Sequence, residues 1–497
     1  MNSVATQEAV KRFLNSEKRL FIGGEWVGAA SKEKIPVLDP ASGELIAEVA
    51  SAGPADVDRA VRSARGALYL RDWRDMAPER REELIRRLAD LIEQNADELA
   101  SLETHDNGML YGFARFLNVT GAVGVLRYMA GWASKIEGHT RQVSVPIPDS
   151  QFFAYTAKEP VGVVAAILPW NVPVMLAAWK LGPALATGCT IVLKPAEETP
   201  LATLRLAELV QQAGFPPGVV NVVTGYGESA GHALVAHADV DKVSFTGSVE
   251  TGKLINRTAT DTLKRVTLEL GGKSPIIVLD DADVDAAIAG AAGGIFMNAG
   301  QVCVAGSRLY AQRKVFERIV AGLAESAKRV KVGPGFDPAS EMGPLVSQAQ
   351  QSRVLGLVRQ GVTEGATIAA GGNTVGRRGF FVEPTVLVNL KNHMRVVQEE
   401  IFGPVIAVQR FDDIDEVVTA ANDSVYGLGA YVWSRDISKV HQIVPQLRAG
   451  TVWINTSAIP HPALPHGGFK RSGFGRDLGR ESLEQFLETK SVLLRVQ

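Results

Sequence analysis

Cysteine is scarce in this chain, with only Cys189 and Cys303 among 497 residues. Two thiols are too few for a disulfide framework, which fits a reducing compartment and leaves any thiol free for chemistry. Neither sign of charge is in excess, because 52 basic residues stand against 54 acidic ones. We therefore expect no nucleic-acid partner and no anionic membrane surface, and a small molecule is the expected partner.

Long apolar runs are also missing. Stretches such as residues 161–170 fall well short of the roughly 20 residues that a membrane helix needs. The amino-terminal residues include Glu8, Lys11 and Arg12 where a signal peptide needs its apolar run. These absences predict a soluble cytoplasmic protein. Its length exceeds what one hydrophobic core usually supports, so two or three structural units are expected.

The amino-terminal part is predicted to be a hairpin followed by helices. Residues 20–27 have the pattern of two short strands that turn at Gly23-Gly24. Apolar residues at three- and four-residue spacing then indicate helices over residues 54–67, 78–102 and 113–136.

Strands and helices alternate clearly between residues 161 and 280. Apolar strands are expected at residues 161–167, 190–193, 219–223 and 242–245, with helices between them. Continuous apolar strands separated by helices indicate a parallel sheet that is covered on both faces. Ligands bind such sheets beyond the carboxyl ends of the strands, so functional residues should follow the strands. A second α/β alternation begins at Pro275.

Residues 139–158 break the helical period that precedes them. Apolar residues alternate with others over 143–147, and 152–156 is rich in β-prone side chains, so we expect a strand pair there. Residues 491–496 are its expected mate. Exposed strands at a domain edge tend to be covered by another chain, so this unit is predicted to be an oligomerisation arm.

Cys303 lies in a loop of small residues, 297–308. Gly300 and Gly306 flank it, and the backbone there can bend and approach a ligand closely. Taken alone, an idle buried thiol is the better interpretation, because free cysteine is among the most buried residue types.

The dinucleotide fingerprint G-x-G-x-x-G is absent. Gly247-Ser248-Val249-Glu250-Thr251-Gly252 stands in its place after a strand and at a helix start, where backbone N–H groups and the helix dipole suit a pyrophosphate. Alone this pattern is weak, since any tight strand-to-helix turn favours glycine. Lys194 and Glu197 at another strand exit could hold ribose hydroxyls, and a carboxylate at a ribose disfavours NADP. A solvated surface turn explains this second motif about as well.

Two further polar residues stand where catalysis could use them. Glu269 lies among apolar residues and is costly to bury without purpose, so a raised pKa that suits a general base is expected. A pairing with Lys273 is the alternative. Asn171 could donate its side-chain N–H to a developing oxyanion, although capping a helix before Pro173 is the commoner use of asparagine.

Five motifs resemble those of the aldehyde dehydrogenase superfamily, in the order in which that family has them. They are Pro169-Trp170-Asn171, Thr267-Leu268-Glu269-Leu270-Gly271-Gly272-Lys273-Ser274-Pro275, Gly300-Gln301-Val302-Cys303, Glu399-Glu400-Ile401-Phe402-Gly403-Pro404 and Pro465-His466-Gly467-Gly468-Phe469-Lys470-Arg471-Ser472-Gly473. The resemblance extends from about residue 20 to the last strand. It implies an α/β fold: a Rossmann-like parallel-sheet NAD-binding domain (1–138 and 161–272), a second α/β catalytic domain (273–478) and a small β oligomerisation arm (139–160 and 479–497), assembled as a dimer or tetramer.

The resemblance also implies a mechanism. Cys303 attacks the aldehyde carbon as a thiolate, while its backbone N–H and the Asn171 side chain hold the oxyanion. Hydride passes to the nicotinamide of NAD, and Glu269 activates the water that hydrolyses the resulting thioester. Glu269 favours this hydrolytic branch, because members that pass the acyl group to coenzyme A lack it. Val302 and Val304 stand where relatives often have cysteines, which leaves Cys303 as the only candidate nucleophile.

The cofactor site follows from the same resemblance. Glu400 would hold the nicotinamide ribose and Phe402 would pack beside the ring, with Trp170 and Gly271 also in the cofactor site. Lys194 and Glu197 would hold the adenosine ribose, and the turn at Gly247 and Ser248 would face the pyrophosphate. No metal is expected.

The substrate entrance at residues 456–466 is more individual. Ile459 and His466 from this segment are expected to form a largely apolar tunnel together with Val172, Leu176, Trp179 and Phe296. Within the superfamily the chain is most similar to the bacterial phenylacetaldehyde dehydrogenases of styrene breakdown. The expected reaction is thus the NAD-dependent oxidation of a bulky apolar aldehyde to its carboxylic acid.

Three alternatives stay open at this point. The substrate could be another aldehyde or a semialdehyde. Cys303 with Glu269 and a lysine could instead form a cysteine hydrolase that needs no nucleotide. A non-enzymatic nucleotide-binding protein is disfavoured, because nucleophile, base and oxyanion donor are all present.

Overall fold

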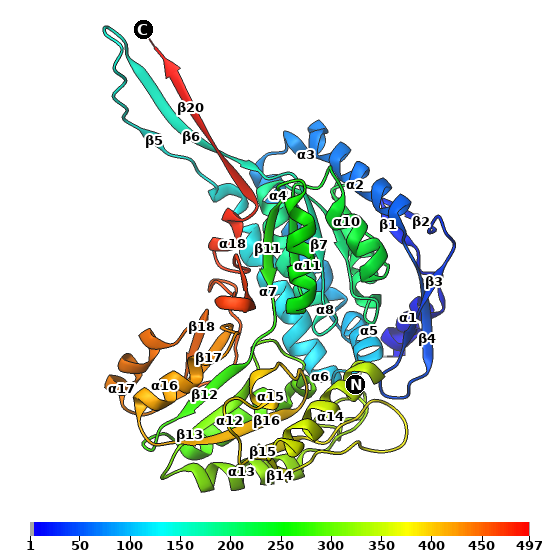
Figure 1. Ribbon diagram of the computed structural model, residues 1–497. Coiled ribbons are helices and arrows are strands. Elements are labelled where there is room, and N and C mark those ends of the chain that lie inside the picture. The colour runs from blue at the N-terminus through cyan, green and yellow to red at the C-terminus, as the bar shows by residue number, and fades with distance from the viewer. Residues whose placement is uncertain (1–3, 497) are drawn as a thin grey trace.

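Two large sheets form the body of the computed structural model, which describes residues 4–496 (Figure 1). Residues 1–3 and 497, the outermost residues of the predicted NAD-binding domain and arm, lie outside the described part. The first sheet has the order β19-β11-β10-β7-β8-β9-β1-β2 and the second β14-β15-β16-β13-β12-β17-β18.

The centre of the first sheet consists of five parallel strands, four of which the apolar runs predict, with β11 as the fifth. They are β7 (Val163–Ile167), β8 (Thr190–Lys194), β9 (Val220–Val222), β10 (Lys242–Thr246) and β11 (Arg265–Glu269), with β1 (Leu20–Ile22), β2 (Glu25–Val27) and β19 (Gly473–Phe474) added antiparallel at the edges. β19 comes from the predicted catalytic segment and returns to the first sheet. The predicted hairpin at residues 20–27 is confirmed.

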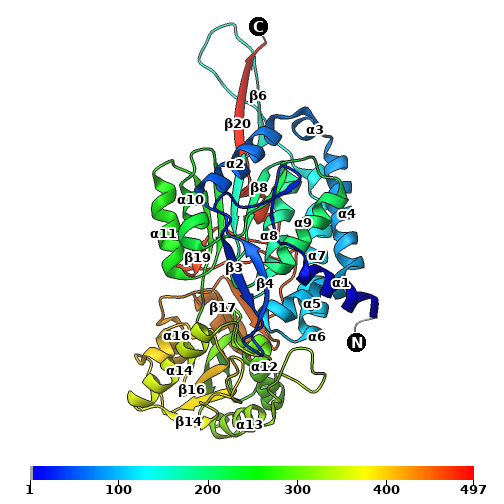
Figure 2. The same ribbon diagram turned by 90° about the vertical axis from the view of Figure 1, so that its right-hand side faces the viewer.

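Helices cover both faces of this sheet because both faces are apolar (Figure 2). Val164 and Ala166 of β7 pack in a core with α4, α5, α7, α8 and α9, while Val163 and Ala165 face α2, α10 and α11. These helices are α2 (Pro54–Tyr69), α4 (Pro78–Gln94), α5 (Ala96–Asn107), α7 (Thr120–Ala130), α8 (Pro173–Thr187), α9 (Leu201–Ala213), α10 (His232–Ala236) and α11 (Val249–Thr260). Every residue of α8 is buried, since it lies between the sheet and the outer helices.

Two predicted long helices are interrupted in the structure. The helix expected over 78–102 is α4 and α5, separated at Asn95, whose side-chain N–H bonds to the carbonyl of Leu91 and competes with the helical pattern. The helix expected over 113–136 contains a π-helical segment, η1 (Ala114–Val119), between the short α6 (Tyr111–Phe113) and α7. α1 (Val4–Asn15) and α3 (Arg71–Arg74) complete the amino-terminal helices, and β3 (Lys34–Leu38) pairs with β4 (Leu45–Ala50).

The second sheet is also parallel apart from one edge strand. Its strands are β12 (Ser274–Val278), β13 (Gly306–Gln312), β14 (Thr367–Ala370, antiparallel), β15 (Thr385–Val388), β16 (Val405–Phe411), β17 (Gly429–Trp433) and β18 (Thr451–Ile454). One face packs on α12 (Val284–Phe296), α13 (Phe316–Arg329), α14 (Gln348–Thr363) and α15 (Arg395–Gln398), and the other on α16 (Ile414–Asn422) and α17 (Ile437–Ile443).

A three-stranded arm extends from the body in both views (Figures 1 and 2). β6 (Phe152–Pro160) pairs antiparallel with β20 (Leu487–Arg495), so that Thr156 lies opposite Ser491, and β5 (Thr140–Arg141) adds to β6. The predicted pairing of these two distant segments is confirmed. A short helix, α18 (Glu481–Glu484), leads into β20.

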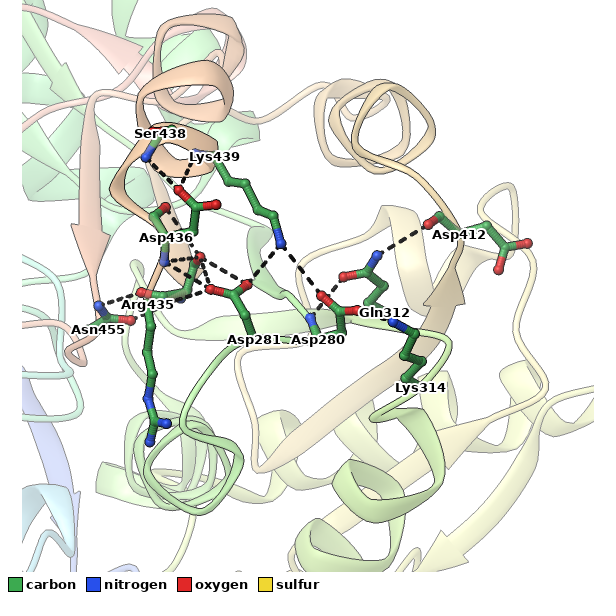
Figure 3. Close-up of polar contacts among 11 residues, drawn as sticks. Asp280, Asp281, Gln312, Lys314, Asp412, Arg435, Asp436, Ser438, Lys439 and Asn455 are labelled. Atoms are coloured by element: carbon green, nitrogen blue, oxygen red, sulfur yellow. Dashed lines mark hydrogen bonds and ion pairs between the residues drawn. The ribbon is translucent and has the colours of Figure 1, made fainter.

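The two sheets meet through opposite strand ends. β11 ends at Glu269 and β12 begins at Ser274, so only residues 270–273 separate the carboxyl end of one sheet from the amino end of the other. At the carboxyl ends of the second sheet, residues that follow neighbouring strands bond to one another (Figure 3). The carboxylate of Asp281, after β12, accepts hydrogen bonds from the backbone N–H groups of Arg435 (2.9 Å) and Asp436 (2.8 Å), after β17. Among residues 4–496, no helix is long and apolar enough to cross a membrane.

Candidate active site

A cavity of about 890 Å³ lies between the facing strand ends of the two sheets. From the first sheet it is lined by the residues after β7, β10 and β11, which include Trp170, Asn171, Gly247, Ser248, Glu269 and Gly271. From the second sheet it is lined by residues that precede β13 and β16, namely Met297, Val302, Cys303, Val304, Glu399, Glu400 and Phe402. Four of the five sequence motifs thus place most of their predicted site residues around one space, and His466 from the fifth joins them.

The Cys303 loop is built from unusual backbone conformations. Asn298, Ala299 and Gly300 have φ values of 48°, 52° and 72°, in the left-handed region that non-glycine residues rarely adopt. A Cβ at Gly300 would lie 2.0 Å from the carbonyl oxygen of Gly403, so only glycine fits there. Tyr431 donates its hydroxyl hydrogen to the Val304 carbonyl over 2.7 Å. The surrounding structure therefore holds the thiol in one place.

Cys303 itself is not an ordinary surface thiol. Burial, together with the nearby carboxylates of Glu400 and Glu269, raises the pKa of its thiol to about 12. The second cysteine, Cys189, is buried in the first core, where its Sγ donates to the carbonyl of Phe486 over 3.3 Å. Of the two cysteines, Cys303 is the one that lines the cavity.

Glu269 is the last residue of β11 and is almost fully buried. Burial raises its carboxyl pKa well above the usual value, nearby Asp477 raises it further, and Lys180 and Arg476 oppose the shift. Neither carboxylate oxygen has a hydrogen-bond partner among the described residues. The alternative pairing with Lys273 is absent, since the Lys273 ammonium also lacks such a partner in the described chain.

Asn171 does not cap a helix. The N-cap of α8 is Val172, whose side chain makes no hydrogen bond to the start of the helix. Asn171 instead donates one side-chain N–H to the carbonyl of Gln301 over 3.0 Å, and Asn298 donates to the Asn171 carbonyl over 3.0 Å. An amide carries two N–H groups, so the second stays available toward the cavity.

Glu400 and Phe402 lie on the opposite wall. Glu400 accepts a hydrogen bond from the Gly272 N–H over 3.0 Å, and burial raises its pKa to about 7. A Cβ at Gly271 would lie 2.0 Å from Glu400 Oε2, so glycine is needed for this approach. Phe402 has a φ of 57° and packs edge-on against Trp170, with ring centroids 5.1 Å apart.

The strand-exit residues fall into two groups. Gly247 and Ser248 line the cavity at the start of α11, where the Ser248 hydroxyl accepts from the Thr251 N–H over 3.2 Å. Lys194 and Glu197 lie outside the lining, at the neighbouring exit of β8. The Lys194 ammonium donates to the Pro195 carbonyl over 3.0 Å and lies 3.4 Å from the Glu197 carboxylate.

The rest of the cavity is a mostly apolar tunnel. It is lined by Phe113, Leu117, Val172, Met175, Leu176, Trp179, Met297, Val302, Trp453, Ala458, Pro460 and His466. The His466 ring packs edge-on against Trp179 with centroids 5.0 Å apart. Burial lowers the His466 pKa to about 4, so this ring is neutral near pH 7.

Two predicted tunnel residues do not line this cavity. Phe296 ends α12 and packs in the core of the second unit, while the next residue, Met297, faces the tunnel. Ile459 is 60% exposed, although Ala458 and Pro460 on either side line the wall. In both cases the expectation is one residue off, because the backbone direction at a helix end or in a loop does not follow a fixed period.

Several tunnel residues were missed by the sequence analysis. Met175 follows Val172 by three positions on the same helical turn, so helical spacing could have found it. Phe113 and Leu117 belong to the region predicted as one continuous helix, and the π-helical segment that directs them has no clear sequence signal.

Comparison with known proteins decides the family. The model of the aldehyde dehydrogenase family matches residues 26–492. The chain belongs to this family. It is 48% identical over 479 residues to phenylacetaldehyde dehydrogenase from Pseudomonas fluorescens, covering 96% of this chain and 95% of that protein. It is 45% identical over 480 residues to retinal dehydrogenase 2 from Gallus gallus, covering 96% and 92%.

Solved structures of family members share the whole fold. The NAD+ complex of an aldehyde dehydrogenase from Bacillus cereus is 49% identical, with a TM-score of 0.96 over 98% of this chain and 99% of that one. Betaine aldehyde dehydrogenase from Staphylococcus aureus in complex with NAD+ is 40% identical, with a TM-score of 0.96 over 99% and 98%. These matches confirm the expected family and fold class.

Proposed function

We propose that this member of the family oxidises a bulky apolar aldehyde, such as phenylacetaldehyde, to its carboxylic acid with NAD as cofactor. The observation that carries the proposal is the meeting of Cys303, Glu269 and Asn171 at one cavity whose remaining walls are mostly apolar. A thiol, a carboxylate of raised pKa and an amide donor are the groups that thioester-forming oxidation and hydrolysis require.

In the proposed reaction, Cys303 Sγ forms a bond to the aldehyde carbon and the carbonyl electrons move to the oxygen. The Cys303 backbone N–H and the free N–H of Asn171 stabilise that oxyanion. When bound, NAD+ would accept the hydride that leaves the former aldehyde carbon, so that this C–H bond breaks, the oxyanion electrons re-form the carbonyl and a thioester remains on Cys303. Glu269 then takes a proton from the water that attacks the thioester on Cys303, and the carbon–sulfur bond breaks to release the acid and the thiol.

The residues around the cavity fit a dinucleotide. The turn at Gly247 and Ser248, where the twelve-residue α11 begins, would face the pyrophosphate with the N–H groups of the helix start, while the Gly247 N–H itself donates to the Glu269 carbonyl over 3.0 Å. Glu400 would hold the nicotinamide ribose, with Phe402, Trp170 and Gly271 beside the ring. Lys194 and Glu197 would hold the adenosine ribose at the next strand exit, and the Glu197 carboxylate would repel the extra phosphate of NADP.

The mostly apolar wall of the tunnel favours an uncharged, apolar substrate. Phenylacetaldehyde and retinal, named in two relatives, are apolar, whereas betaine aldehyde, named in a third, carries a charge. The acidic side chains among the described lining residues are Glu269, Glu400, its neighbour Glu399 and Glu250 beside the pyrophosphate turn, and the apolar tunnel wall itself holds no acidic group that would pair with such a charge. An apolar aldehyde therefore fits best, and we place the enzyme in styrene breakdown in the cytoplasm.

A substrate panel tests this proposal. Phenylacetaldehyde, benzaldehyde, hexanal and a charged semialdehyde are each mixed with enzyme and NAD or NADP, and NADH absorbance is followed. The highest kcat/KM is expected for phenylacetaldehyde with NAD. Preference for the semialdehyde would contradict the apolar-tunnel account, and no absorbance change with any aldehyde would favour the cysteine hydrolase.

We also propose that the chain is a homo-oligomer, a dimer or tetramer, joined through the arm. Phe153, Tyr155, Leu493 and Leu494 are large apolar side chains that are exposed on β6 and β20, and such surfaces tend to be covered by another chain. The domain limits stated above stay a prediction. Sedimentation of a stable monomer at micromolar concentration would rule the oligomer out.

A further inference from the structure

The segment from Trp170 to Met175 joins the proposed oxyanion donor to the tunnel wall. Trp170, Asn171, Val172 and Met175 all line the cavity. The first turn of α8 begins within this segment at Pro173 and receives no side-chain cap from its own N-cap residue. Its leading N–H groups therefore need partners from elsewhere in the fold.

Those partners come from two buried residues outside the helix. Glu103 on α5 accepts the Val174 N–H over 2.8 Å, and Asn118 in η1 accepts the Met175 N–H over 3.1 Å. The two side chains are also joined, since the Asn118 amide donates to the second Glu103 oxygen over 2.5 Å. Both residues are fully buried. Every contact of the carboxylate is thus with an N–H donor.

A second member of α5 holds the other end of the segment. Asn107 donates its side-chain N–H to the Trp170 carbonyl over 2.8 Å. The segment is therefore tied to the α5–η1 layer on both sides of Asn171. A buried carboxyl group is costly unless its hydrogen bonds are satisfied. Here they are made with Asn118 and with Val174, which lies between the lining residues Val172 and Met175.

The same helix offers an internal comparison. Asp106, one turn after Glu103, is also fully buried, and its carboxylate accepts the Leu201 N–H at the start of α9 over 2.9 Å. α9 contributes no residue to the cavity lining. Glu103 and Asp106 thus each accept an N–H at the start of a helix, although one Asp106 oxygen has no partner among the described residues, and they differ in what the supported helix does.

We propose that Glu103 and Asn118 are positioning residues of the aldehyde site, which fix the first turn of α8 and through it both the tunnel wall at Val172 and Met175 and the amide of Asn171. The inference rests on the proposed roles of that tunnel and amide. It predicts that disturbing either residue alters the handling of aldehyde while the binding of NAD is unchanged, because Trp170, the one proposed cofactor residue in this segment, is held by Asn107 and not by Glu103 or Asn118.

An exchange of the two functional groups tests the proposal. Glu103→Gln alone replaces one acceptor oxygen by an NH2 group. This group faces the NH2 group of Asn118, so two hydrogen-bond donors meet without an acceptor between them. Adding Asn118→Asp restores a complete pattern, because the new amide donates to the new carboxylate, which still accepts from Met175. The single variant should lose about tenfold to hundredfold in kcat/KM for phenylacetaldehyde, and the double variant should recover to within about threefold of wild type.

The readouts separate positioning from a general loss of stability. KM for phenylacetaldehyde is compared with KM for acetaldehyde, because KM does not depend on the fraction of enzyme that is folded and active. Glu103→Gln should raise the first KM more than the second and leave KM for NAD unchanged. The matched control Asp106→Asn keeps an oxygen that can accept the Leu201 N–H and should leave the ratio of KM for the two aldehydes unchanged.

Three results would overturn the proposal. They are a wild-type ratio of KM for phenylacetaldehyde to KM for acetaldehyde in Glu103→Gln, no recovery of kcat/KM in the double variant, or a change of that KM ratio in Asp106→Asn as large as in Glu103→Gln. If Glu103→Gln does not fold, Asn118→Ala, which removes both the acceptor of the Met175 N–H and the donor to Glu103, is measured in the same way. Failure of the proposed substrate class is seen separately, since it changes which aldehyde the wild type prefers and leaves the recovery by the double variant intact.

Discussion

Asn171 donates a side-chain N–H to the backbone carbonyl of Gln301 over 3.0 Å. This hydrogen bond joins the residue that follows β7 of the first sheet to the loop that carries Cys303 in the second. The amide and the thiol therefore keep a fixed relation to each other, although 132 positions separate them in the sequence. An oxyanion formed at Cys303 would meet a donor that is already oriented, which is the condition for efficient electrostatic stabilisation.

Replacing the proposed nucleophile should abolish turnover. Cys303→Ala is expected to show no NADH formation above background and to bind NADH with wild-type affinity in a fluorescence titration, because the nucleotide residues lie on other elements. Cys189→Ala is the matched control and should keep a near wild-type rate, since Cys189 lies in the core. Residual steady-state turnover in Cys303→Ala would contradict the assignment.

Glu269 should lower the stability of the folded protein at alkaline pH. Its folded-state pKa is raised, so the folded protein binds this proton more tightly than the unfolded chain does. The free energy of unfolding therefore falls as the pH rises from the unfolded value of about 4.5 toward the folded one, by about 1.4 kcal/mol for each pKa unit between them.

Removing this charge should reverse the effect. Glu269→Gln is expected to melt at least about 2 °C above wild type at pH 8, with a difference that shrinks toward pH 5. Glu317→Gln, on an exposed face of α13, is the control and should change Tm little. A lower Tm for Glu269→Gln at pH 8 would show that the buried carboxylate stabilises the fold instead.

A methyl group at Gly271 should damage the cofactor site. Its Cβ would lie 2.0 Å from Glu400 Oε2, so Glu400 must move and lose its bond to Gly272. Gly271→Ala is expected to raise KM for NAD about tenfold and KM for the aldehyde much less. Gly356→Ala on α14, where a Cβ meets open space, is the control and should leave both constants unchanged. An unchanged KM for NAD in Gly271→Ala would show that Glu400 does not hold the cofactor.

The pattern of apolar residues predicts four central strands of the first sheet, because these strands are buried on two faces and need continuous apolar side chains. For the second sheet it indicates the α/β alternation that begins at Pro275 but few of the individual strands. It also predicts the pairing of β6 with β20. It does not reveal the interruption at Asn95 or the π-helical segment, because these depend on side-chain competition and tertiary packing rather than on periodicity.

The candidate site is predictable from local rules only in part. Asn171, Gly247 and Glu269 follow strands of the first sheet, where the general rule for parallel sheets places ligands. Cys303 and Glu400 precede strands of the second sheet, where no such rule applies, and family motifs alone indicate them. The buried carboxylate of Glu103 carries no local signal at all, since its partners on α8 are some 70 positions away and set by the fold.

The most direct test of the central claim is a rapid-mixing experiment on Glu269→Gln with NAD and phenylacetaldehyde. If Cys303 forms the thioester and Glu269 activates the water, the variant should release close to one NADH per active site in a fast burst and then turn over slowly. The acyl group should be found on Cys303 by mass spectrometry of the quenched enzyme. A normal steady-state rate without a burst would contradict the account.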